Sequence, residues 1–370
     1  MPQLSGTAAM RTPLARARHL PGAIYASPDI LALEHERLFK HRWLCVGRVE
    51  ELPAVGDFLT MRIAGQPIIV VRENIERIVA LRNRCVHRGV EVAYGQGNAR
   101  EFVCPYHAWS FDLAGRLTGA GYMKNTEWDR DAAALPAVRL ETWRGWMFVN
   151  FDAAAAPLAE WMRPFEGPLD YYRSDEAVLG DKLVVEVKTN WKFVVENLLD
   201  IYHVGTLHAN TFGKFMRLIR DELPFDALPN GGVSLRFGSR PMSADGSQSF
   251  PFLPWIDDLG FAAKANIFPN MNLSMRADSM RMWVMWPLAV DRTQIISYLL
   301  VNKDAAAQPD YPAKLEAYRN YMRSIVAEDQ TAVESLQRNA TAADFEPGPM
   351  SHLEAPIHHV LNHYLDAMQL

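Results

Sequence analysis

The spacing of apolar and polar residues changes twice along the chain. Over residues 28–43, apolar side chains recur at roughly helical intervals behind a Ser27-Pro28 start, which predicts a short helix. From residue 44 to about residue 155, short runs of β-branched and aromatic residues alternate with Gly, Pro, Asn and Asp turn signals, as in QPIIVVR, RIVALRN, REFVC and WMFVNF. This segment is therefore predicted to form a small antiparallel β domain.

The rest of the chain mixes helical and strand-like patterns. Helical spacing over 191–203 and 312–338 brackets strand-like runs at 183–187, 281–286 and 294–301, which predicts an α+β domain. The run Ala153–Ala156, ended by Pro157, is the predicted boundary between the two domains. We expect an N-terminal arm and helix at 1–43 that packs on the C-terminal domain, a β domain at 44–155 and an α+β domain at 156–370.

Composition and charge exclude several classes of protein. Hydrophobic residues make up 49% of the chain, and the formal net charge of −5 gives no general attraction to nucleic acid or anionic membranes. With only three cysteines, a disulfide framework is excluded and a reducing compartment is expected. Residues 1–25 contain no continuous apolar segment, and no later stretch approaches a membrane span, so we predict a cytoplasmic protein with a mobile N-terminal arm.

Two loops of the predicted β domain each combine one cysteine with one histidine. The segment NRCVHRG carries Cys85 and His87, and the segment VCPYHAW carries Cys104 and His107, with sixteen residues (88–103) between the pairs. Zinc and iron–sulfur clusters both bind thiolate and imidazole, but a structural zinc site usually takes two like ligands from one turn. Mixed pairs suit a Rieske [2Fe–2S] cluster, in which two Cys hold one iron and two His the other. We predict this cluster, with zinc as the alternative; the remaining cysteine, Cys45, is expected to be a buried core residue.

A second group of polar residues lies in the mostly apolar segment NWKFVVENLLDIYHVGTLH. Glu196, Asp200 and His203 follow one another at i, i+4 and i+7, which places them on one face of a helix. A buried polar stripe is tolerated when it is bound to a metal or hydrogen-bonded. His208 lies about 140° away from His203 on a regular helix. The helix must therefore bulge or break, and we expect Gly205 to let it do so.

Two histidines at one point invite a third, anionic ligand. The 2-His-1-carboxylate arrangement leaves open positions on non-haem Fe(II) for O2 and substrate. In the predicted helix over 313–338, Asp329 falls on the inward stripe formed by Met322, Ile325, Val333 and Leu336. We predict that Asp329 completes an iron site with His203 and His208; the alternative is a core-edge carboxylate paired with an arginine. The neighbouring acids, Glu328 and Glu334, are expected on a solvated face.

As a set, these residues resemble the α subunits of the Rieske ring-hydroxylating oxygenases, a family that includes aromatic dioxygenases and carnitine, choline and betaine-type monooxygenases. The similarity runs from about residue 28 to the C-terminus. The family's cluster pattern is matched by the four Cys and His residues above, and its late acidic ligand corresponds to Asp329. Its catalytic pattern, Asn-Trp-Lys followed by Glu-Asn-x2-Asp-x-Tyr-His-x4-His, is matched by Asn190, Trp191, Lys192, Glu196, Asn197, Asp200, Tyr202, His203 and His208.

The resemblance implies a fold, cofactors, partners and an assembly. The expected fold is α+β, with an N-terminal Rieske antiparallel β domain and a C-terminal helix-grip-like (START/Bet v1-like) catalytic domain built on an antiparallel sheet. The expected cofactors are a [2Fe–2S] cluster and a mononuclear Fe(II). Electrons would come from NAD(P)H through a separate reductase, with or without a ferredoxin, because no GxGxxG loop follows a strand here. In the implied head-to-tail homotrimer, Asp200 corresponds to the acid that bridges a cluster histidine of the neighbouring subunit to an iron-bound histidine.

The substrate is less well defined by the sequence. The expected reaction is mono- or dioxygenation of an aromatic compound or aromatic acid, and the alternative is a quaternary ammonium compound of betaine, carnitine or choline type held by cation–π contacts. Arg276 or Arg281 can anchor a carboxylate, although an exposed arginine is commoner. Eight large apolar residues can line an apolar pocket or simply fill the core: Phe252, Trp255, Phe261, Met271, Met275, Met280, Trp283 and Trp286.

One expectation about further histidines and two competing functions remain at this point. The histidines near the C-terminus are expected to serve packing or surface roles rather than a third metal site; they are His352, His358, His359 and His363. A zinc-stabilised binding module, in which His203 and His208 are structural, is one competing function. A Rieske electron-transfer protein without a mononuclear iron is the other.

Overall fold

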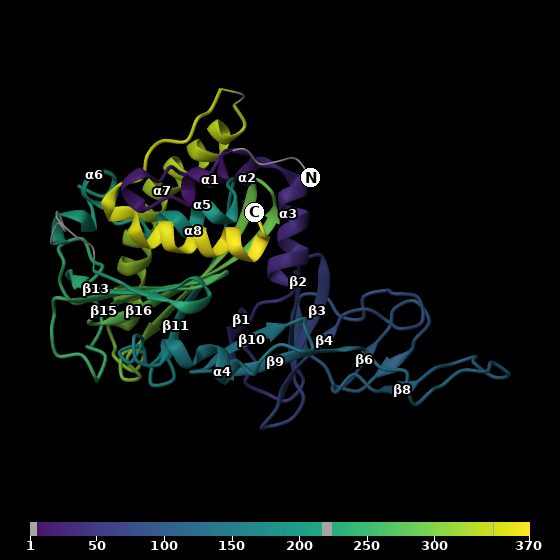
Figure 1. Cartoon of the computed structure of the whole chain (residues 1–370). Coiled ribbons are helices and arrows are strands. Elements are labelled where there is room, and N and C mark those ends of the chain that lie inside the picture. The colour runs from purple at the N-terminus through teal and green to yellow at the C-terminus, as the bar shows by residue number, and fades with distance from the viewer. Residues whose placement is uncertain (1–5, 217–223, 343) are drawn as a thin grey trace. The chain divides into compact units, whose positions relative to one another are not determined.

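The computed structural model describes residues 6–216, 224–342 and 344–370. The chain divides into two compact units, His35–Trp161 and the combination of Met1–Glu34 with Met162–Leu370 (Figure 1). The predicted functional boundaries near residues 43 and 155 lie close to this division and stay a prediction.

The smaller unit is built on antiparallel sheets, which confirms the expected β domain. Its seven-stranded sheet has the order β1-β10-β9-β4-β3-β2-β5. In that order, the strands are Leu44–Arg48, Trp146–Asn150, Ala137–Trp143, Ile78–Arg82, Gln66–Arg72, Asp57–Ile63 and Gln96–Asn98. A second sheet of three short strands contains β6 (Phe102–Val103), β7 (Ser110–Phe111) and β8 (Leu117–Gly119).

Two of the three cysteines belong to a hydrophobic cluster of the smaller unit. Cys85 and Cys104 are buried together with Phe102, Trp109 and Phe111, so both thiols face the interior at the base of their loops. Cys45 is far from the other two cysteines in the sequence and lies fully buried in β1. Burial raises the pKa of its thiol to about 12. The expectation that Cys45 is an inert core residue is therefore confirmed.

The larger unit packs helices on one antiparallel sheet, which confirms the α+β expectation. The sheet has the order β11-β17-β16-β15-β14-β13-β12. In that order, the strands are Val178–Val187, Arg292–Val301, Ser279–Ala289, Met271–Arg276, Phe261–Ile267, Gly232–Gly238 and Asp226–Leu228. The helix α5 (Trp191–Leu199) packs on β14 and β16, and it contacts both α7 (Tyr311–Ala340) and α8 (Ala355–Met368) (Figure 1).

Shorter helices complete the two units. In the larger unit these are α1 (Thr7–Met10), α2 (Ala23–Ala26) and α6 (Val204–Leu207). The helix predicted at 28–43 begins as α3 (Pro28–Glu34) and continues as a short π-helix, His35–Phe39. The segment Leu158–Met162 forms α4. Along the part of the chain that the structure describes, we find no helix with the length and hydropathy needed to cross a bilayer.

A buried ion pair joins α3 to the start of α5 and explains part of the Asn-Trp-Lys motif. Lys192 Nζ lies 2.5 Å from Glu34 Oε1, and both side chains are almost fully buried. Trp191 Nε1 donates to Glu34 Oε2 at 2.8 Å, and the hydroxyl of Tyr364 on α8 donates to Oε1 at 2.8 Å. Because removing one partner of such a pair leaves an uncompensated charge, the motif fixes α5 in the interior. The position of α5 in turn determines where Asp200, at its C-terminal end, lies.

Candidate functional site

The polar stripe starts on a helix but does not stay on it. Asn190 caps α5 by accepting the Lys192 N–H at 3.0 Å, and α5 ends at Leu199. Asp200 is extended, and its Oδ1 accepts the N–H of Tyr202 at 2.7 Å, so a local side-chain turn replaces the next helical bond. The predicted helix over 191–203 is therefore confirmed as far as Leu199, and the expected break before His208 exists, but its predicted place at Gly205 is wrong. The break occurs at Asp200, and Gly205 lies inside the short helix α6.

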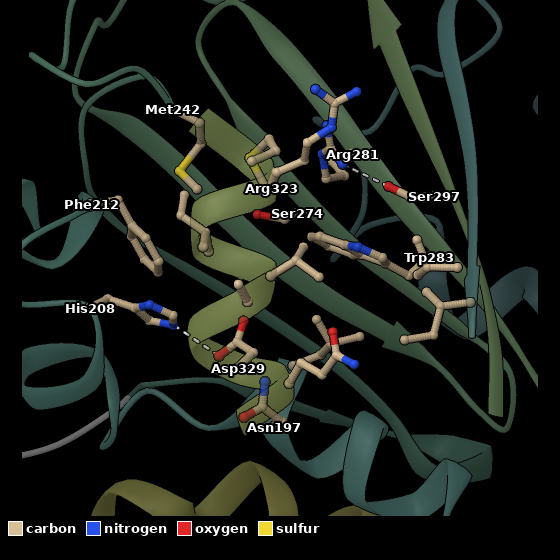
Figure 2. A pocket seen from close by; sticks show the side chains of 18 of the residues that line it. Asn197, His208, Phe212, Met242, Ser274, Arg281, Trp283, Ser297, Arg323 and Asp329 are labelled. Atoms are coloured by element: carbon tan, nitrogen blue, oxygen red, sulfur yellow. Dashed lines mark hydrogen bonds and ion pairs between the residues drawn. The ribbon is translucent and has the colours of Figure 1, made fainter. Parts of the chain in front are cut away.

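This break brings three ligand atoms to one point. His203 Nε2 and His208 Nε2 lie 3.2 Å apart. Asp329 Oδ1, from α7, lies 3.0 Å from His208 Nε2 and 3.5 Å from His203 Nε2. Figure 2 shows His208 and Asp329 pointing toward each other from opposite elements. Within the described ranges, no other three His, Cys, Asp or Glu residues bring ligand atoms within 4.8 Å of one another.

The spacing of these atoms fits a metal held on one face. A divalent ion bonded to each ligand at about 2.1 Å, at right angles, would place the ligand atoms about 3 Å apart. Asp329 Oδ1 is buried without a hydrogen bond of good geometry, so its lone pair is free to bind a cation. Burial acts to raise the pKa of Asp329, but His203 and His208 hold that pKa well below its usual range. The carboxylate is therefore anionic, as a metal ligand must be.

Each histidine has a carboxylate behind it. His203 Nδ1 lies 3.0 Å from Asp200 Oδ2, and His208 Nδ1 lies 2.6 Å from Glu328 Oε2. Thr211 Oγ1 donates to the same oxygen of Glu328 at 2.9 Å. Burial acts to lower the pKa of His203, but Asp200 and Asp329 raise it overall. Such carboxylate–imidazole contacts orient the rings and leave both Nε2 atoms to face the candidate metal position, although the contact of His203 Nδ1 is an ion pair without a hydrogen bond of good geometry.

The expectation that Glu328 belongs to a solvated face is wrong. Neighbouring residues on a helix point about 100° apart. A spacing that places Asp329 on the inward face therefore predicts Glu328 on the outward face. In the structure, however, Nδ1 of His208 contacts the Glu328 carboxylate from another element. The available signal was chemical, because a ligand histidine needs an acceptor for its second nitrogen. The other acid, Glu334, accepts from Lys188 N at 3.2 Å and Gln330 Nε2 at 2.7 Å, away from the histidines.

Glu328→Gln is expected to weaken binding of Fe(II) by about 10–100-fold. Glutamine retains a hydrogen-bonding group beside His208 Nδ1 but loses the charge that polarises the ring. The affinity is measured by titrating the chelator-treated protein with Fe(II) and analysing bound metal. Glu334→Gln on the same helix is the matched control and should bind iron like the unaltered chain. Equal affinities for the Glu328→Gln protein and this control would contradict the role of Glu328.

The Cys/His loops of the smaller unit present a different arrangement. Cys85 and Cys104 are buried, whereas His87 and His107 are exposed, with ring centroids 4.7 Å apart. Backbone hydrogen bonds close both turns: Gly89 N–H donates to Cys85 O at 2.7 Å, and Ala108 N–H donates to Cys104 O at 3.0 Å. Gly89 has φ +83°, a conformation that glycine adopts without strain.

This arrangement fits a cluster better than a single ion. The four side chains form no group in which three ligand atoms converge, among the residues that the structure describes, as a tetrahedral zinc would require. Buried thiols below and exposed imidazoles above instead match a cluster whose inner iron takes Cys and whose outer iron takes His. Burial raises the pKa of the Cys85 thiol, and the neighbouring Cys104 adds to the shift. Metal binding is what would keep such thiols ionised.

A cavity of about 320 Å³ opens beside His203, His208 and Asp329. One wall is the sheet, with alternate residues of β11, β15, β16 and β17 facing inward, and the other is formed by α5 and α7. Leu183, Val185 and Val187 make an apolar stripe along β11. Figure 2 shows Phe212 and Met242 near His208, and Trp283 projecting from the sheet. A volume at the small end of the range for ligand sites suits a small organic molecule.

More than half of the chain matches one family. The family is described as "Ring hydroxylating alpha subunit (catalytic domain)", and the match covers residues 174–370. The chain belongs to this family. Residues 42–139 additionally match the "Rieske [2Fe-2S] domain".

Curated relatives in this family are similar over most of their length. The glycine betaine monooxygenase oxygenase subunit of Chromohalobacter salexigens is 27% identical, over 94% of this chain and 88% of the relative. The carnitine monooxygenase oxygenase subunit of Escherichia coli (strain K12) is 29% identical, over 86% of this chain and 83% of the relative. Among solved structures, the quaternary ammonium Rieske monooxygenase CntA in complex with L-carnitine superposes with a TM-score of 0.78 at 23% identity, covering 96% of this chain and 97% of that one.

Family membership settles the reaction class. The chain is a Rieske oxygenase component that uses a [2Fe–2S] cluster and a mononuclear iron, as the resemblance implied. As the oxygenase subunit of a multicomponent system it depends on a reductase or ferredoxin partner. A zinc-stabilised binding module and a pure electron-transfer protein are therefore not supported. The expected aromatic substrate is not the one that the relatives' names favour.

Several smaller predictions meet mixed outcomes. Of the eight apolar residues proposed for a pocket, Trp283 lines the cavity, whereas Met271, Met275 and Met280 are buried in the core. Leu336, expected on the inward stripe of α7, is 46% exposed, so that expectation is wrong.

Three of the four C-terminal histidines have the packing roles expected of them. His358 Nε2 lies 3.0 Å from the carbonyl oxygen of Met10, and His359 Nε2 lies 3.0 Å from that of Leu228. The ring of His363 meets Phe268 edge-on at 5.4 Å.

Proposed function

We propose that this chain is the oxygenase component of a system that monooxygenates a betaine-type compound, a small molecule with a quaternary ammonium group and a carboxylate. The observation that carries the oxygenase assignment is the convergence of His203 Nε2, His208 Nε2 and Asp329 Oδ1 beside a cavity. Support for the substrate class comes from the glycine betaine and carnitine monooxygenase subunits to which the chain is similar. This replaces the aromatic substrate expected from the sequence.

The residues that hold the cofactors are part of the proposal. Cys85 and Cys104 would bind the inner iron of the cluster, and His87 and His107 the outer one; His203, His208 and Asp329 would bind the mononuclear iron. Bound there, the iron supplies the one-electron and O2 chemistry that side chains lack. The chain's own part is to hold both imidazoles through Asp200 and Glu328, and to line the cavity with the apolar stripe on β11.

The assembly and the cellular setting are also proposals. We infer a homotrimer in which the cluster of one subunit supplies electrons to the iron of the next, with Asp200 between them. An NAD(P)H-dependent reductase would deliver the electrons. No disulfide joins the described cysteines, which suits a reducing compartment such as the cytoplasm.

An aromatic acid is a second candidate substrate, and one observation favours it. Lys264, Arg276 and Arg281 line the cavity, whereas Asp329 is the only acidic residue among its described lining residues. Because Asp329 is the proposed metal ligand, no further acid is there to offset a quaternary ammonium. A cation would have to rely on aromatic faces such as those of Phe212 and Trp283.

The test is a turnover assay with defined substrates. The iron-loaded chain, supplied with NADH and a surrogate reductase, is given glycine betaine, carnitine, choline or benzoate, and consumption of O2 and NADH is recorded. We expect substrate-dependent consumption with glycine betaine or carnitine, and one labelled oxygen atom in the product after turnover in 18O2. Coupled turnover with benzoate alone would overturn the betaine assignment while leaving the oxygenase intact. No coupled turnover with any of the four would count against both substrate classes.

A further inference from the structure

One wall of the cavity carries three cations side by side. In the sheet, Lys264 on β14 stands opposite Ser274 on β15, which stands opposite Arg281 on β16. Residues directly opposite each other in an antiparallel pair share a face, so the side chains of Lys264, Ser274 and Arg281 all face the cavity. Arg276 is two residues from Ser274 on the same strand and shares that face as well. The sheet register therefore concentrates positive charge on this wall.

Both arginines are buried, contrary to the expectation that they are exposed. Arg276 is 3% exposed and Arg281 is 8% exposed. Neither makes an ion pair with a carboxylate, as far as the described residues extend. Arg281 Nη1 donates to Ser297 Oγ at 2.8 Å and its Nε to Tyr318 Oη at 3.3 Å; Figure 2 shows Arg281 and Ser297 together on the strands.

Arg276 is even less satisfied than Arg281. Its Nη1 donates to the Met275 carbonyl at 2.9 Å and to Ser274 Oγ at 3.3 Å, but its buried Nε has no hydrogen-bond partner. The guanidinium lies over the ring of Phe237, 5.3 Å from its centroid. Burial lowers the pKa of Arg276 to about 10, which still leaves it charged at neutral pH.

The nearby acids are already engaged by other groups. Asp278 accepts the N–H groups of Ser249 at 2.8 Å and Phe250 at 3.3 Å, together with the hydroxyl of Ser279 at 3.0 Å. Asp278 influences Arg276 only at longer range. Asp181 forms its ion pair with Arg319. A buried guanidinium without a carboxylate is a large unfavourable term in the ligand-free chain, and an anion entering the cavity would remove it.

We propose that Arg276 and Arg281 form a carboxylate-binding subsite that holds the acid group of the substrate against the sheet, so that the rest of the molecule faces His203, His208 and Asp329. The proposal deepens the proposed function and rests on it for the reaction. Guanidinium groups suit this task because their planar forks match a carboxylate. A betaine and an aromatic acid both carry the required group, so the subsite explains why the cavity suits either.

The other cations at the cavity do not serve this purpose equally well. Arg323, at the mouth, is 59% exposed in its side chain and donates to Asn320 Oδ1 at 2.6 Å. Lys264 Nζ donates to the Leu198 carbonyl at 2.6 Å, which ties it to the end of α5. Lys264 thus adds to the positive potential of this wall, whereas Arg276 retains a hydrogen-bond donor, Nε, that has no partner.

The experiment compares ligands that differ in the carboxylate, with the iron-loaded chain and calorimetric titration. The pairs are glycine betaine against choline and benzoate against benzyl alcohol. In the unaltered chain we expect glycine betaine to bind on the order of 30-fold more tightly than choline, the difference a charge-assisted pair provides. If glycine betaine does not bind, we expect the same preference for benzoate over benzyl alcohol. Arg276→Gln and Arg281→Gln should each remove most of that preference, and Tyr318→Phe should reduce it less.

Controls separate loss of the subsite from loss of the fold. Arg276→Lys and Arg281→Lys keep the charge without the fork and should retain part of the preference. Arg236→Gln removes an arginine that pairs with Asp170 on the outside of the same sheet, and it should bind ligands like the unaltered chain. Iron content and the optical spectrum of the cluster are measured for each variant, so that a misfolded protein is recognised.

The outcomes distinguish the subsite from the substrate class. Choline binding and turning over as well as glycine betaine would overturn the subsite while the quaternary ammonium function stands. Benzoate binding in an Arg276-dependent manner, without binding of glycine betaine, would support the subsite and overturn the betaine assignment. Arginine variants that fold, hold iron and bind both acids unchanged would overturn the subsite outright.

Discussion

Asp329→Ala is expected to lower substrate oxidation by on the order of 1,000-fold or more, the effect of losing several kcal/mol of metal-dependent catalysis. The carboxylate is the anionic member of the three converging ligand atoms, and its oxygen lies 3.0 Å from His208 Nε2. Without it, two imidazoles remain to hold the metal. The optical spectrum of the cluster in the smaller unit should be unchanged, because none of its proposed ligands is altered. Iron analysis should show loss of the mononuclear iron alone.

The matched control for Asp329→Ala lies five residues further along α7. Glu334→Gln also removes an acid from this helix but leaves the contacts with Lys188 and Gln330 open to an amide. It should retain both iron content and turnover. An Asp329→Ala protein that keeps a full complement of iron and oxidises substrate at the rate of this control would refute the assignment of Asp329 as a ligand.

The sequence predicted the ligand candidates because those residue types rarely occur by chance in such positions. Cysteine and histidine alternate on two loops of a β-rich segment, and Asp329 interrupts an apolar stripe. Each departs from what a plain core or surface would contain, so chemistry was the better explanation. The elements themselves followed from periodicity, as the confirmed α7 and the strands β11, β16 and β17 show.

Other parts of the site depend on tertiary packing that periodicity does not contain. Asp200 was placed on a continuous helix because its spacing fits one, yet its side chain ends that helix by bonding to Tyr202 N–H. Glu328 was assigned to solvent because it neighbours an inward residue, yet His208 reaches it from another element. In both cases a side-chain hydrogen bond outweighed the helical pattern.

The substrate pocket was the least predictable part for a related reason. Trp283 and Met280 both occur on β16, and only the strand register decides which of them faces the cavity. An arginine in a strand is more often exposed, and only the sheet pairing shows that Arg276 and Arg281 point inward. One residue of register would exchange the two faces. The chemistry of the cavity was therefore outside the reach of composition and spacing.

Asp200→Asn, loaded with excess Fe(II), is expected to hold both metals and yet lower turnover by at least about 100-fold, because it loses the negative charge proposed to lie between them. Asparagine retains an oxygen that can accept the Tyr202 N–H, so the turn that ends α5 should persist. What it lacks is the negative charge beside His203 Nδ1, 3.0 Å away. In the proposed trimer that carboxylate also faces a cluster histidine of the neighbouring subunit, so its charge serves electron transfer as well as orientation.

The measurement separates these two roles of Asp200. The protein is reduced with dithionite, mixed with oxygen and substrate in a stopped-flow instrument, and the reoxidation of the cluster is followed optically. If Asp200 bridges the two metals, the cluster of the iron-loaded Asp200→Asn protein stays reduced far longer, whether or not Fe(II) affinity also falls. If Asp200 only orients His203, iron affinity falls by about 10–100-fold and reoxidation of the iron-loaded fraction is normal. Normal affinity together with normal reoxidation would show that the acid at the end of α5 has neither role.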